Sequence, residues 1–502
     1  MNAIIPGARE FDGARVAVMG MGKSGRASVA ALLHHTDAAL GVWDAQESAV
    51  AEYASEGRIA RVFASDEAGE LARDVVAWNP THVVISPAFA EEGADWKVLS
   101  SGGITPISEI ELAWKLRAAR EDGSFAQWLA VTGTNGKTTT VTMLAAILAQ
   151  AGLGDGVALG NIGNPAVTAV SDTSKEIPAA YAFELSSFQL ASTYSMQAAA
   201  AACLNLADDH LEWHSSFDSY RRAKAKIYEG VQKACIYPVG DTQVQAMVDG
   251  ADVVEGARAI GTTLGIPSVG MLGVAEGLVL DRAFTPKRQT EAMELFSLED
   301  LLHLAPVGGS LPVHIVKDAL AASALARSIG VAPEQIRLAL SRYSTEHHRI
   351  EYVATVQGVR YVDDSKATNA HAALASVSAQ REQSVVWIVG GQPKGARFDD
   401  LVDKVRSKIR AAVVIGVDQE AWQQAFAAER FPVIYVDPEV QDPMAAAVQW
   451  ARKLAQADDT VLLAPATASM DQFKSYAARG DAFAREVRAL DGGAGKQSED
   501  TP

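Results

Sequence analysis

The residues with the clearest chemical potential lie at positions 132 to 140, in the sequence TGTNGKTTT. An apolar strand pattern, WLAVTG, precedes this segment and a helical pattern follows it. In such a loop the backbone N–H groups and the helix dipole face a polyphosphate, Lys137 reaches the terminal phosphates and Thr138 can hold Mg²⁺. The usual pattern has an earlier glycine, five residues before Gly136, where this chain has Val131. The segment therefore predicts a nucleotide site unlike that of most GTPases and small-molecule kinases.

Three downstream side chains could complete this site. Glu184 ends the apolar run AYAFE, where a carboxylate can make a further contact to Mg²⁺. A solvated carboxylate at a strand end is the alternative. His210 and His214 have the i, i+4 spacing of zinc helices, but no convincing third ligand lies nearby. We therefore interpret His210 alone as a polar ligand beside the nucleotide.

Lys224 is the third of these side chains, and it falls inside the apolar helical face formed by Tyr220, Ile227 and Tyr228. A lysine in this position either snorkels to solvent or is functional. Partial burial would lower its pKa, and a neutral amine can react with CO₂ to give a carbamate that binds metal ions. The residues alone leave both alternatives open.

Cations beside glycines recur in the last third of the chain. The segments HHRIEYV, VDDSKATNAHAAL and GGQPKGARFDDL place Arg349, Lys366 and Lys394 at strand ends and in loops. Such positions suit the capture of anions near the carboxyl edge of a sheet. A solvated loop is the alternative for each residue taken singly.

A second glycine pattern, GMGKSG at 20 to 25, follows the first strand pattern of the chain. Asp44 ends the next apolar run, about where a dinucleotide fold has its ribose-binding acid. This pair supports an alternative function, that of an NAD-dependent dehydrogenase. The pattern is weak evidence, because glycines serve any tight strand-to-helix turn and a helix N-terminus accepts any diphosphate.

The elements that must position these residues alternate along the chain. Short β-branched runs at 15–20, 82–86, 128–133, 384–390, 411–416 and 459–466 alternate with long amphipathic helical patterns. This alternation predicts an α/β fold with parallel sheets covered by helices on both faces. A chain of 502 residues exceeds what one core supports, so we predict domains at 1–124, 125–345 and 346–490, and a disordered tail at 491–502.

Composition excludes several classes of protein. The net charge of −17 disfavours a broad nucleic-acid surface. No apolar run approaches the roughly 18 residues needed to span a bilayer, and the N-terminus has no export signal. Cys203 and Cys235 are too few for a disulfide framework and are interpreted as buried thiols. We expect a soluble, cytoplasmic protein that acts on small molecules, without nucleic-acid or membrane partners, and a monomer.

Taken in order, the segments TGTNGKTTT, GNIG, ELSSFQL, LNLADDHLEWH, YRRAKAKIYE, HRIE, DDSKATN and ASMDQFKSYAARGDAF resemble the Mur ligase family. The resemblance covers nearly the whole chain, and ELSSFQL and DDSKATN are its most specific parts. The family's loop reads TG[TS]NGK[TS] without the earlier glycine, and its nucleotide is ATP. The resemblance implies a Rossmann-like first domain, a central P-loop ATPase-like domain with a mostly parallel sheet, and a Rossmann-like C-terminal domain.

The branch that the chain resembles adds D-glutamate to UDP-N-acetylmuramoyl-L-alanine through an acyl phosphate, during peptidoglycan precursor synthesis in the cytoplasm. Another amino-acid-adding Mur ligase, or a ligase like folylpolyglutamate synthetase, is the alternative within this class. A nucleotide-binding scaffold without chemistry is a third possibility, and the combination of Lys137, Glu184, His210 and Lys224 argues against it.

The resemblance also implies roles for individual residues. Two Mg²⁺ ions are expected, one on Thr138 and Glu184 and the other on His210 and the carbamate of Lys224, and Lys366 is expected near the reacting carboxylate. The expected ATP contacts are Gly133, Thr134, Asn135, Gly136, Lys137, Thr138, Thr139, Arg349 and Asp364. The expected contacts to the UDP substrate are Gly22, Lys23, Ser24, Asp44, Ser86, Asn161, Ser186 and Gln189. The expected D-glutamate pocket comprises Thr368, Lys394, Ser469 and Tyr476.

Some positions depart from the family's usual pattern. Around the uridine these are Ala45, Gln46 and Ala88, and near the adenine they are Ile315 and Asp318. Arg397 replaces the usual acid after the Lys394 loop. None of them belongs to the expected metal or phosphoryl core.

Overall fold

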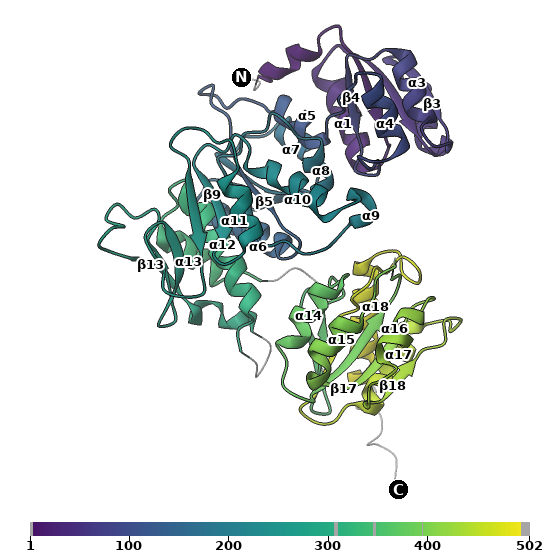
Figure 1. Cartoon of the computed structure of the whole chain (residues 1–502), viewed down its shortest axis with the longest axis vertical. Helices are drawn as coiled ribbons and strands as arrows, with labels where there is room; N and C mark the ends of the chain where they lie inside the picture. The colour runs from purple at the N-terminus through teal and green to yellow at the C-terminus, as the bar shows by residue number, and fades with distance from the viewer. Residues whose placement is uncertain (1–3, 306–309, 345–347, 394, 493–502) are drawn as a thin grey trace. The chain divides into compact units, whose positions relative to one another are not determined.

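The computed structural model of the chain describes residues 4–305, 310–344, 348–393 and 395–492 (Figure 1). Contacts divide the chain into two compact units. The first comprises residues 1–300 and 316–343, and the second comprises residues 301–315 and 344–502. The described residues form three sheets, two of them in the first unit. The prediction of an α/β fold built on parallel sheets is confirmed.

The first sheet has the strand order β3-β2-β1-β4, and its pairings are parallel. Side chains alternate across each strand, so β1 packs Val16 and Val18 with α1 and α5 on one face, and Ala17 and Met19 with α3 and α4 on the other. The strands are β1 (Arg15–Met19), β2 (Ala39–Asp44), β3 (Ile59–Ala64) and β4 (His82–Ile85). The helices are η1 (Pro6–Phe11), α1 (Lys23–His35), α2 (Glu47–Val50), η2 (Ala51–Tyr53), α3 (Glu70–Trp78), α4 (Ala94–Ser101) and α5 (Glu109–Lys115).

The central sheet has the order β13-β12-β11-β10-β9-β8-β5-β7-β6. It is parallel from β6 to β11, and β12 and β13 add an antiparallel edge. Its strands are β5 (Gln127–Thr132), β6 (Ala158–Gly160), β7 (Ala180–Glu184), β8 (Ala200–Cys203), β9 (Ala234–Pro238), β10 (Arg258–Thr262), β11 (Met271–Ala275), β12 (Leu278–Asp281) and β13 (Met293–Ser297).

The helices of this region include two that straddle the division between the units, η4 (Leu298–Leu304) and α12 (Val313–Ser328). The others are α6 (Lys137–Gln150), α7 (Ala166–Val170), α8 (Ser187–Ala191), α9 (Leu211–His214), α10 (Phe217–Ala225), η3 (Lys226–Tyr228), α11 (Thr242–Asp249) and α13 (Pro333–Leu340). The connection from β7 to β8 crosses β5, which lies between these two strands in the sheet. Loops on either side of such a crossing point diverge and leave room for a ligand at the carboxyl edge.

The start of α5 ties the first sheet to the central sheet. Ser108 donates its backbone N–H to Ser192 O at 2.8 Å, and the Glu109 carboxylate accepts from Val167 N at 2.6 Å. Glu111 accepts from the backbone N–H groups of Tyr194 and Ser195. Burial raises the pKa of the Glu109 carboxyl to about 7, although the α7 amides oppose that rise. These contacts explain why both sheets belong to one unit.

The C-terminal sheet has the order β14-β15-β19-β16-β17-β18, in which only the β14–β15 pairing is antiparallel. Its strands are β14 (Glu351–Val356), β15 (Val359–Asp363), β16 (Val385–Gly390), β17 (Ile409–Ile415), β18 (Val433–Tyr435) and β19 (Thr460–Leu463). Its helices are α14 (Ala370–Ser378), α15 (Asp399–Val405), η5 (Arg406–Lys408), α16 (Glu420–Phe426), α17 (Pro443–Leu454) and α18 (Tyr476–Gly492).

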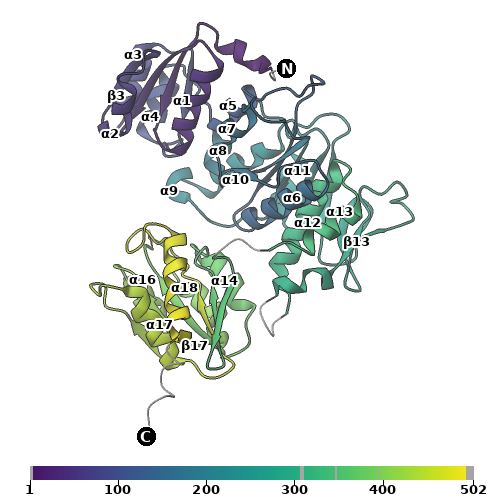
Figure 2. The same cartoon turned by 180° about the vertical axis from the view of Figure 1, so that it is seen from behind.

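Helices cover this sheet on both faces, as Figures 1 and 2 show. Trp387 and Val389 pack with α14, α15 and α16, whereas Val386 and Ile388 pack with α17 and α18. Helix α18 continues to Gly492, two residues into the range predicted to be a tail. No helix among the described residues is long and apolar enough to cross a membrane.

Glu109 generates a prediction about pH. Because its pKa is raised in the folded state, folding takes up protons between pH 4.5 and about 7, and stability should fall as the pH rises through this window. Glu109→Gln should reduce the drop in melting temperature between pH 5 and pH 8 by about 2–4 °C. Differential scanning calorimetry at the two pH values measures this. Glu121→Gln, a change at an exposed residue, is the control and should behave as the wild type; an unchanged pH dependence in Glu109→Gln would contradict the role of its burial.

Candidate active site

The loop between β5 and α6 requires glycine at two positions. Gly133 and Gly136 have φ values of 150° and 82°, in the region that side chains disfavour. A Cβ atom on Gly136 would lie 2.4 Å from Asp318 Oδ1, so the close approach of Asp318 adds a second constraint. Gly136 is the N-cap of α6, and the loop therefore presents the start of a helix of 14 residues.

Neighbouring segments hold the loop in this shape. Asn135 N donates to Asn205 Oδ1 at 2.8 Å, and Asn205 Nδ2 donates back to Asn135 O at 3.0 Å. The Thr134 and Tyr220 hydroxyls lie 2.9 Å apart. The loop is thus bonded to the segment after β8 and to α10.

Strand register brings an acid to the same edge. Glu184, at the end of β7, pairs with Val131 of β5 and Gly160 of β6. Its carboxylate accepts from Thr138 Oγ1 at 2.8 Å and from Asn161 Nδ2 at 2.9 Å. Two oxygen ligands suited to Mg²⁺, Thr138 Oγ1 and Glu184 Oε2, therefore lie in contact at the start of α6.

Two lysines meet at the same carbonyl. Lys137 Nζ donates to Gly133 O at 2.8 Å and to Thr134 O at 2.9 Å. Lys224 Nζ donates to Gly133 O at 2.9 Å and to Thr132 Oγ1 at 3.2 Å. Lys224 is only 2% exposed, which is burial rather than snorkelling. Burial, and next the charge of Lys137, lower the pKa of Lys224 to about 7.

The two histidines of LADDHLEWH have different surroundings. His210 precedes α9 with a left-handed backbone (φ 53°), and its side chain is 44% exposed. His214 is 1% exposed and its Nε2 lies 2.8 Å from Ser187 Oγ. Burial lowers the pKa of His214 to about 4, so its imidazole is neutral at pH 7. No cluster of three metal-binding His, Cys, Asp or Glu residues found in the described part of the chain includes either histidine, so the zinc alternative gains no support.

The residues expected to contact the UDP substrate fall into two groups. Gly22, Lys23, Ser24, Asp44 and Ser86 lie where β1, β2 and β4 end, at the carboxyl edge of the first sheet. Asp44 accepts from Met21 N at 2.6 Å and from Gln46 N at 2.9 Å, so its carboxylate is bonded to the GMGKSG turn.

The second group, Asn161, Ser186 and Gln189, lies at the carboxyl edge of the central sheet. Ser186 and Gln189 form a capping box at the start of α8, in which each side chain bonds the backbone N–H of the other residue.

In the C-terminal unit, Asp364 is 4% exposed and burial raises its pKa to about 7. The neighbouring charge of Arg349 and a hydrogen bond from the Ser376 hydroxyl oppose that rise. Arg349 also lines a cavity of about 410 Å³ within this unit. Lys366 Nζ lies 5.7 Å from the centre of the Tyr476 ring.

Thr368 and Ser469 belong to loops at the carboxyl edge of the C-terminal sheet, and Thr368 N donates to Lys366 O at 2.8 Å. The expected cation of the D-glutamate pocket, Lys394, lies outside the described residues.

Arg479 joins the loops at the carboxyl edge of the C-terminal sheet. Its side chain is fully buried and donates to Ser365 O at 2.9 Å, to Thr467 O at 3.2 Å and to Gly390 O at 3.4 Å. Burial lowers the pKa of its guanidinium to about 10. One side chain thus fixes the relative positions of the loops that carry Lys366, Thr368 and Ser469.

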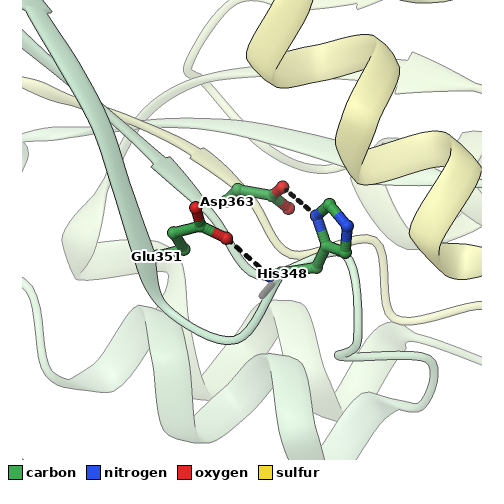
Figure 3. Close-up of side chains that lie close together, drawn as sticks. All are labelled: His348, Glu351 and Asp363. Atoms are coloured by element: carbon green, nitrogen blue, oxygen red, sulfur yellow. Dashed lines mark hydrogen bonds and ion pairs between the residues drawn. The ribbon is translucent and has the colours of Figure 1, made fainter. Parts of the chain in front are cut away.

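A second cluster of the C-terminal unit consists of His348, Glu351 and Asp363 (Figure 3). His348 Nδ1 lies 2.7 Å from Asp363 Oδ2, and Glu351 accepts from His348 N at 2.8 Å. The three groups have the chemistry of metal ligands, but hydrogen bonds already join them, and the bond to Asp363 raises the pKa of His348, which favours the imidazolium. We therefore interpret the cluster as an ionic clamp at the start of β14, next to Arg349.

The sequence interpretation missed three residues that hold segments around the expected sites: Asn205, Arg479, and His214 in its structural role. Asn205 could have been found from the sequence, because it is a polar residue just after an apolar strand pattern. Arg479 lies three residues after Tyr476 in a segment already recognised, but its role depends on loops that are distant in the sequence.

The three sheets and the loop at β5 define a class of protein: an α/β protein whose central sheet carries a P-loop-like loop at the start of α6. Family models extend this assignment. The Mur ligase middle domain matches residues 131–259, and the Mur ligase glutamate ligase domain matches residues 348–467.

Curated relatives match the chain over nearly its whole length. UDP-N-acetylmuramoylalanine--D-glutamate ligase of Streptomyces coelicolor is 45% identical, over 96% of this chain and 99% of its own. The enzyme of the same name from Thermobifida fusca is 43% identical, over 96% of this chain and all of its own. The chain belongs to the Mur ligase family.

Solved structures agree on the fold. A pseudomurein peptide ligase type C from Methanothermus fervidus superposes with a TM-score of 0.53 at 16% identity, covering 96% of this chain and 100% of that one. A MurF ligase from Thermotoga maritima in complex with ADP gives a TM-score of 0.52 at 15% identity, with 97% of each chain covered. This likeness supports the three-part α/β architecture.

Arg479 generates the prediction of this subsection. Arg479→Lys should destabilise the C-terminal unit by at least about 2 kcal/mol, because a lysine cannot bond all the buried acceptors and leaves some unsatisfied. Hydrogen exchange of the loops around Ser365 and Thr467 should report faster opening. Arg485→Lys on the same helix, at a side chain 60% exposed, is the control. Equal exchange rates in the two variants would contradict the role of Arg479.

Proposed function

We propose that this chain is the ATP-dependent ligase that adds D-glutamate to UDP-N-acetylmuramoyl-L-alanine, forming an amide, ADP and phosphate. One observation carries the proposal: Lys137, Thr138, Glu184 and Lys224 meet at the end of β5, in a chain that matches ligases named for this reaction over 96% of its length. In the reaction, a carboxylate oxygen of the UDP substrate attacks the γ-phosphorus of ATP and ADP leaves. The D-glutamate amine then attacks the acyl carbon, loses a proton and displaces phosphate.

The ATP side is assigned to the β5–α6 loop. The backbone N–H groups from Gly133 to Thr139 and the positive end of α6 suit the β- and γ-phosphates. Lys137 is proposed to stabilise the negative charge of the phosphoryl group as it transfers. Arg349 and Asp364 are proposed to contact the nucleotide from the C-terminal unit.

The residues at the carboxyl edge of the central sheet suit Mg²⁺. Thr138 Oγ1 and Glu184 Oε2 lie 2.8 Å apart and offer hard oxygen ligands. His210 and a carbamate on Lys224 are proposed as ligands of a second ion. When bound, such ions neutralise the phosphates and the attacking carboxylate.

The charge of Lys137 beside Lys224 favours a carbamate on Lys224. Two ammonium groups share the carbonyl of Gly133 and repel one another. No carboxylate of the described residues forms an ion pair with Lys224, and its lowered pKa leaves a large fraction of neutral amine at pH 7. Addition of CO₂ to that amine, with loss of a proton, replaces a repelled cation by an anion that attracts Lys137.

The UDP moiety is assigned to Gly22, Lys23, Ser24, Asp44 and Ser86, and the acceptor end of this substrate to Asn161, Ser186 and Gln189. Lys366 is proposed to lie near the reacting carboxylate. D-glutamate is assigned to Thr368, Lys394, Ser469 and Tyr476, and Arg479 organises the loops that carry Thr368 and Ser469. D-glutamate is preferred over other amino acids because the full-length relatives are named for it.

We further propose that the protein acts as a monomer and in the cytoplasm, where ATP and UDP-linked sugars are available. The product is a precursor for peptidoglycan.

The function and Lys137 can be tested together by phosphate release. The wild type should release phosphate with ATP only when both UDP-N-acetylmuramoyl-L-alanine and D-glutamate are present, and L-glutamate should be a very poor substitute. Lys137→Ala should lower kcat by at least about 100-fold, because the lost cation acts on charge that develops during transfer.

The control is Lys175→Ala, at a side chain 80% exposed, which should retain full activity. Efficient use of L-glutamate or of a diamino acid would move the chain to another branch of the family. A folded Lys137→Ala variant that keeps most of its activity would refute the assignment of the loop.

Lys224 generates a second prediction. Lys224→Ala should lose activity, and formate or acetate should partly restore it by supplying the missing carboxylate oxygens to the metal. In the wild type, ¹³C-bicarbonate should give a carbamate signal in the ¹³C NMR spectrum, and this signal should be absent in Lys224→Ala.

Lys226→Ala serves as the comparison, because it removes a nearby lysine that bonds Ala191 O outside the loop. It should keep the carbamate signal. A wild-type spectrum without the signal, together with no recovery by carboxylic acids, would rule the carbamate out.

A further inference from the structure

The short helix α9 contacts the loop after β4 through the side chain of Trp213. Trp213 Nε1 donates to Pro87 O at 3.0 Å. Pro87 follows Ser86 at the end of β4, and Ser86 packs so closely on Gly20 that a Cβ atom there would lie 2.5 Å from Ser86 Cβ. The loop that Trp213 holds is therefore the loop that packs on the GMGKSG turn, where the diphosphate of the UDP substrate is assigned.

The same helix contacts α8 and α10, beside the central sheet, through the next residue. The His214 ring stacks on Phe188 with an interplanar angle of 17° and lies 5.4 Å from the ring of Tyr220. Its Nε2 lies 2.8 Å from Ser187 Oγ. Tyr220 OH in turn lies 2.9 Å from Thr134 Oγ1 of the β5–α6 loop. A continuous series of contacts thus runs from Pro87 through Trp213, His214 and Tyr220 to the phosphate-binding loop.

The backbone around α9 limits its freedom. His210, just before the helix, and Ser215, just after it, both have left-handed φ values, 53° and 61°. Non-glycine residues in this region are held there by their surroundings. The Trp213 ring also packs against Phe188 at 4.9 Å and His214 at 4.4 Å. The indole N–H is therefore presented to Pro87 by a packed segment rather than by a mobile side chain.

We propose that Trp213 is a positioning residue for the UDP substrate. It sets the Ser86–Phe89 loop at a fixed distance from the phosphate-binding loop, so that the diphosphate and acceptor ends of the substrate can be bound at the same time. The inference rests on the proposed function. This role differs from a purely structural one in its selectivity. Removal of the N–H donor should weaken the binding of the UDP substrate and leave the binding of ATP and D-glutamate unaffected.

The test is steady-state kinetics of Trp213→Phe, which keeps an aromatic ring and removes the donor. KM for UDP-N-acetylmuramoyl-L-alanine should rise roughly three- to tenfold, as expected for one hydrogen bond. The kcat value and the KM values for ATP and D-glutamate should stay within twofold. Calorimetric titration of the UDP substrate without ATP should show the same loss of affinity.

Trp450→Phe is the matched control, since it removes an indole N–H from an exposed side chain of α17, and its kinetics should equal those of the wild type. Trp213→His keeps a ring N–H and should bind the UDP substrate more tightly than Trp213→Phe. An unchanged KM in Trp213→Phe, a loss confined to kcat, or equal affinities of the two Trp213 variants would overturn the inference alone. A wild type that does not use the UDP substrate would overturn the proposed function and this inference with it.

Discussion

The position of β5 within the central sheet is the constraint on which the proposed site depends. Because β7 and β8 flank β5 and run parallel to it, their carboxyl ends must meet at one edge. Lys137, Glu184 and His210 are far apart in the sequence, yet each lies at the carboxyl end of one of these strands or in the segment after it. The hydrogen bond from Thr138 to Glu184 is a direct consequence of this register.

Much of this could be predicted from the sequence, because the signals are local. The strand patterns at 15–20, 82–86 and 128–133 correspond to β1, β4 and β5 with a difference of one residue, and the remaining three differ by at most three residues. Buried parallel strands produce continuous apolar runs that need no tertiary information to recognise. The glycines of the β5–α6 loop were recognisable for the same reason, since φ constraints act on single residues.

Other features could not be read from the sequence, because they depend on partners that folding brings together. His214 had the spacing of a zinc ligand, but its burial against Ser187 makes it a neutral structural group. Arg479 gains its role only when loops from three strands converge on it. Asp318 departs from the family pattern, yet it lies against Gly136, and the Thr140 hydroxyl donates to it at 3.2 Å. Lys394 stays a prediction from the resemblance.

The lysine pair shows how such a site can hold unfavourable charge. A buried lysine whose pKa falls from 10.5 to about 7 binds fewer protons than the unfolded chain between these values, so the folded state is relatively more stable at the upper end of this range. Near pH 7 the ammonium form is therefore costly, and the nearby charge of Lys137 adds to that cost. Removal of the proton from Lys224 removes this cost. A carbamate on Lys224 also reverses the sign of the charge beside Lys137, so that repulsion becomes attraction. The same burial that destabilises the ammonium form makes the amine nucleophilic toward CO₂, so burial and the charge of Lys137 account for the lowered pKa of Lys224, and the neutral amine accounts for its proposed chemistry.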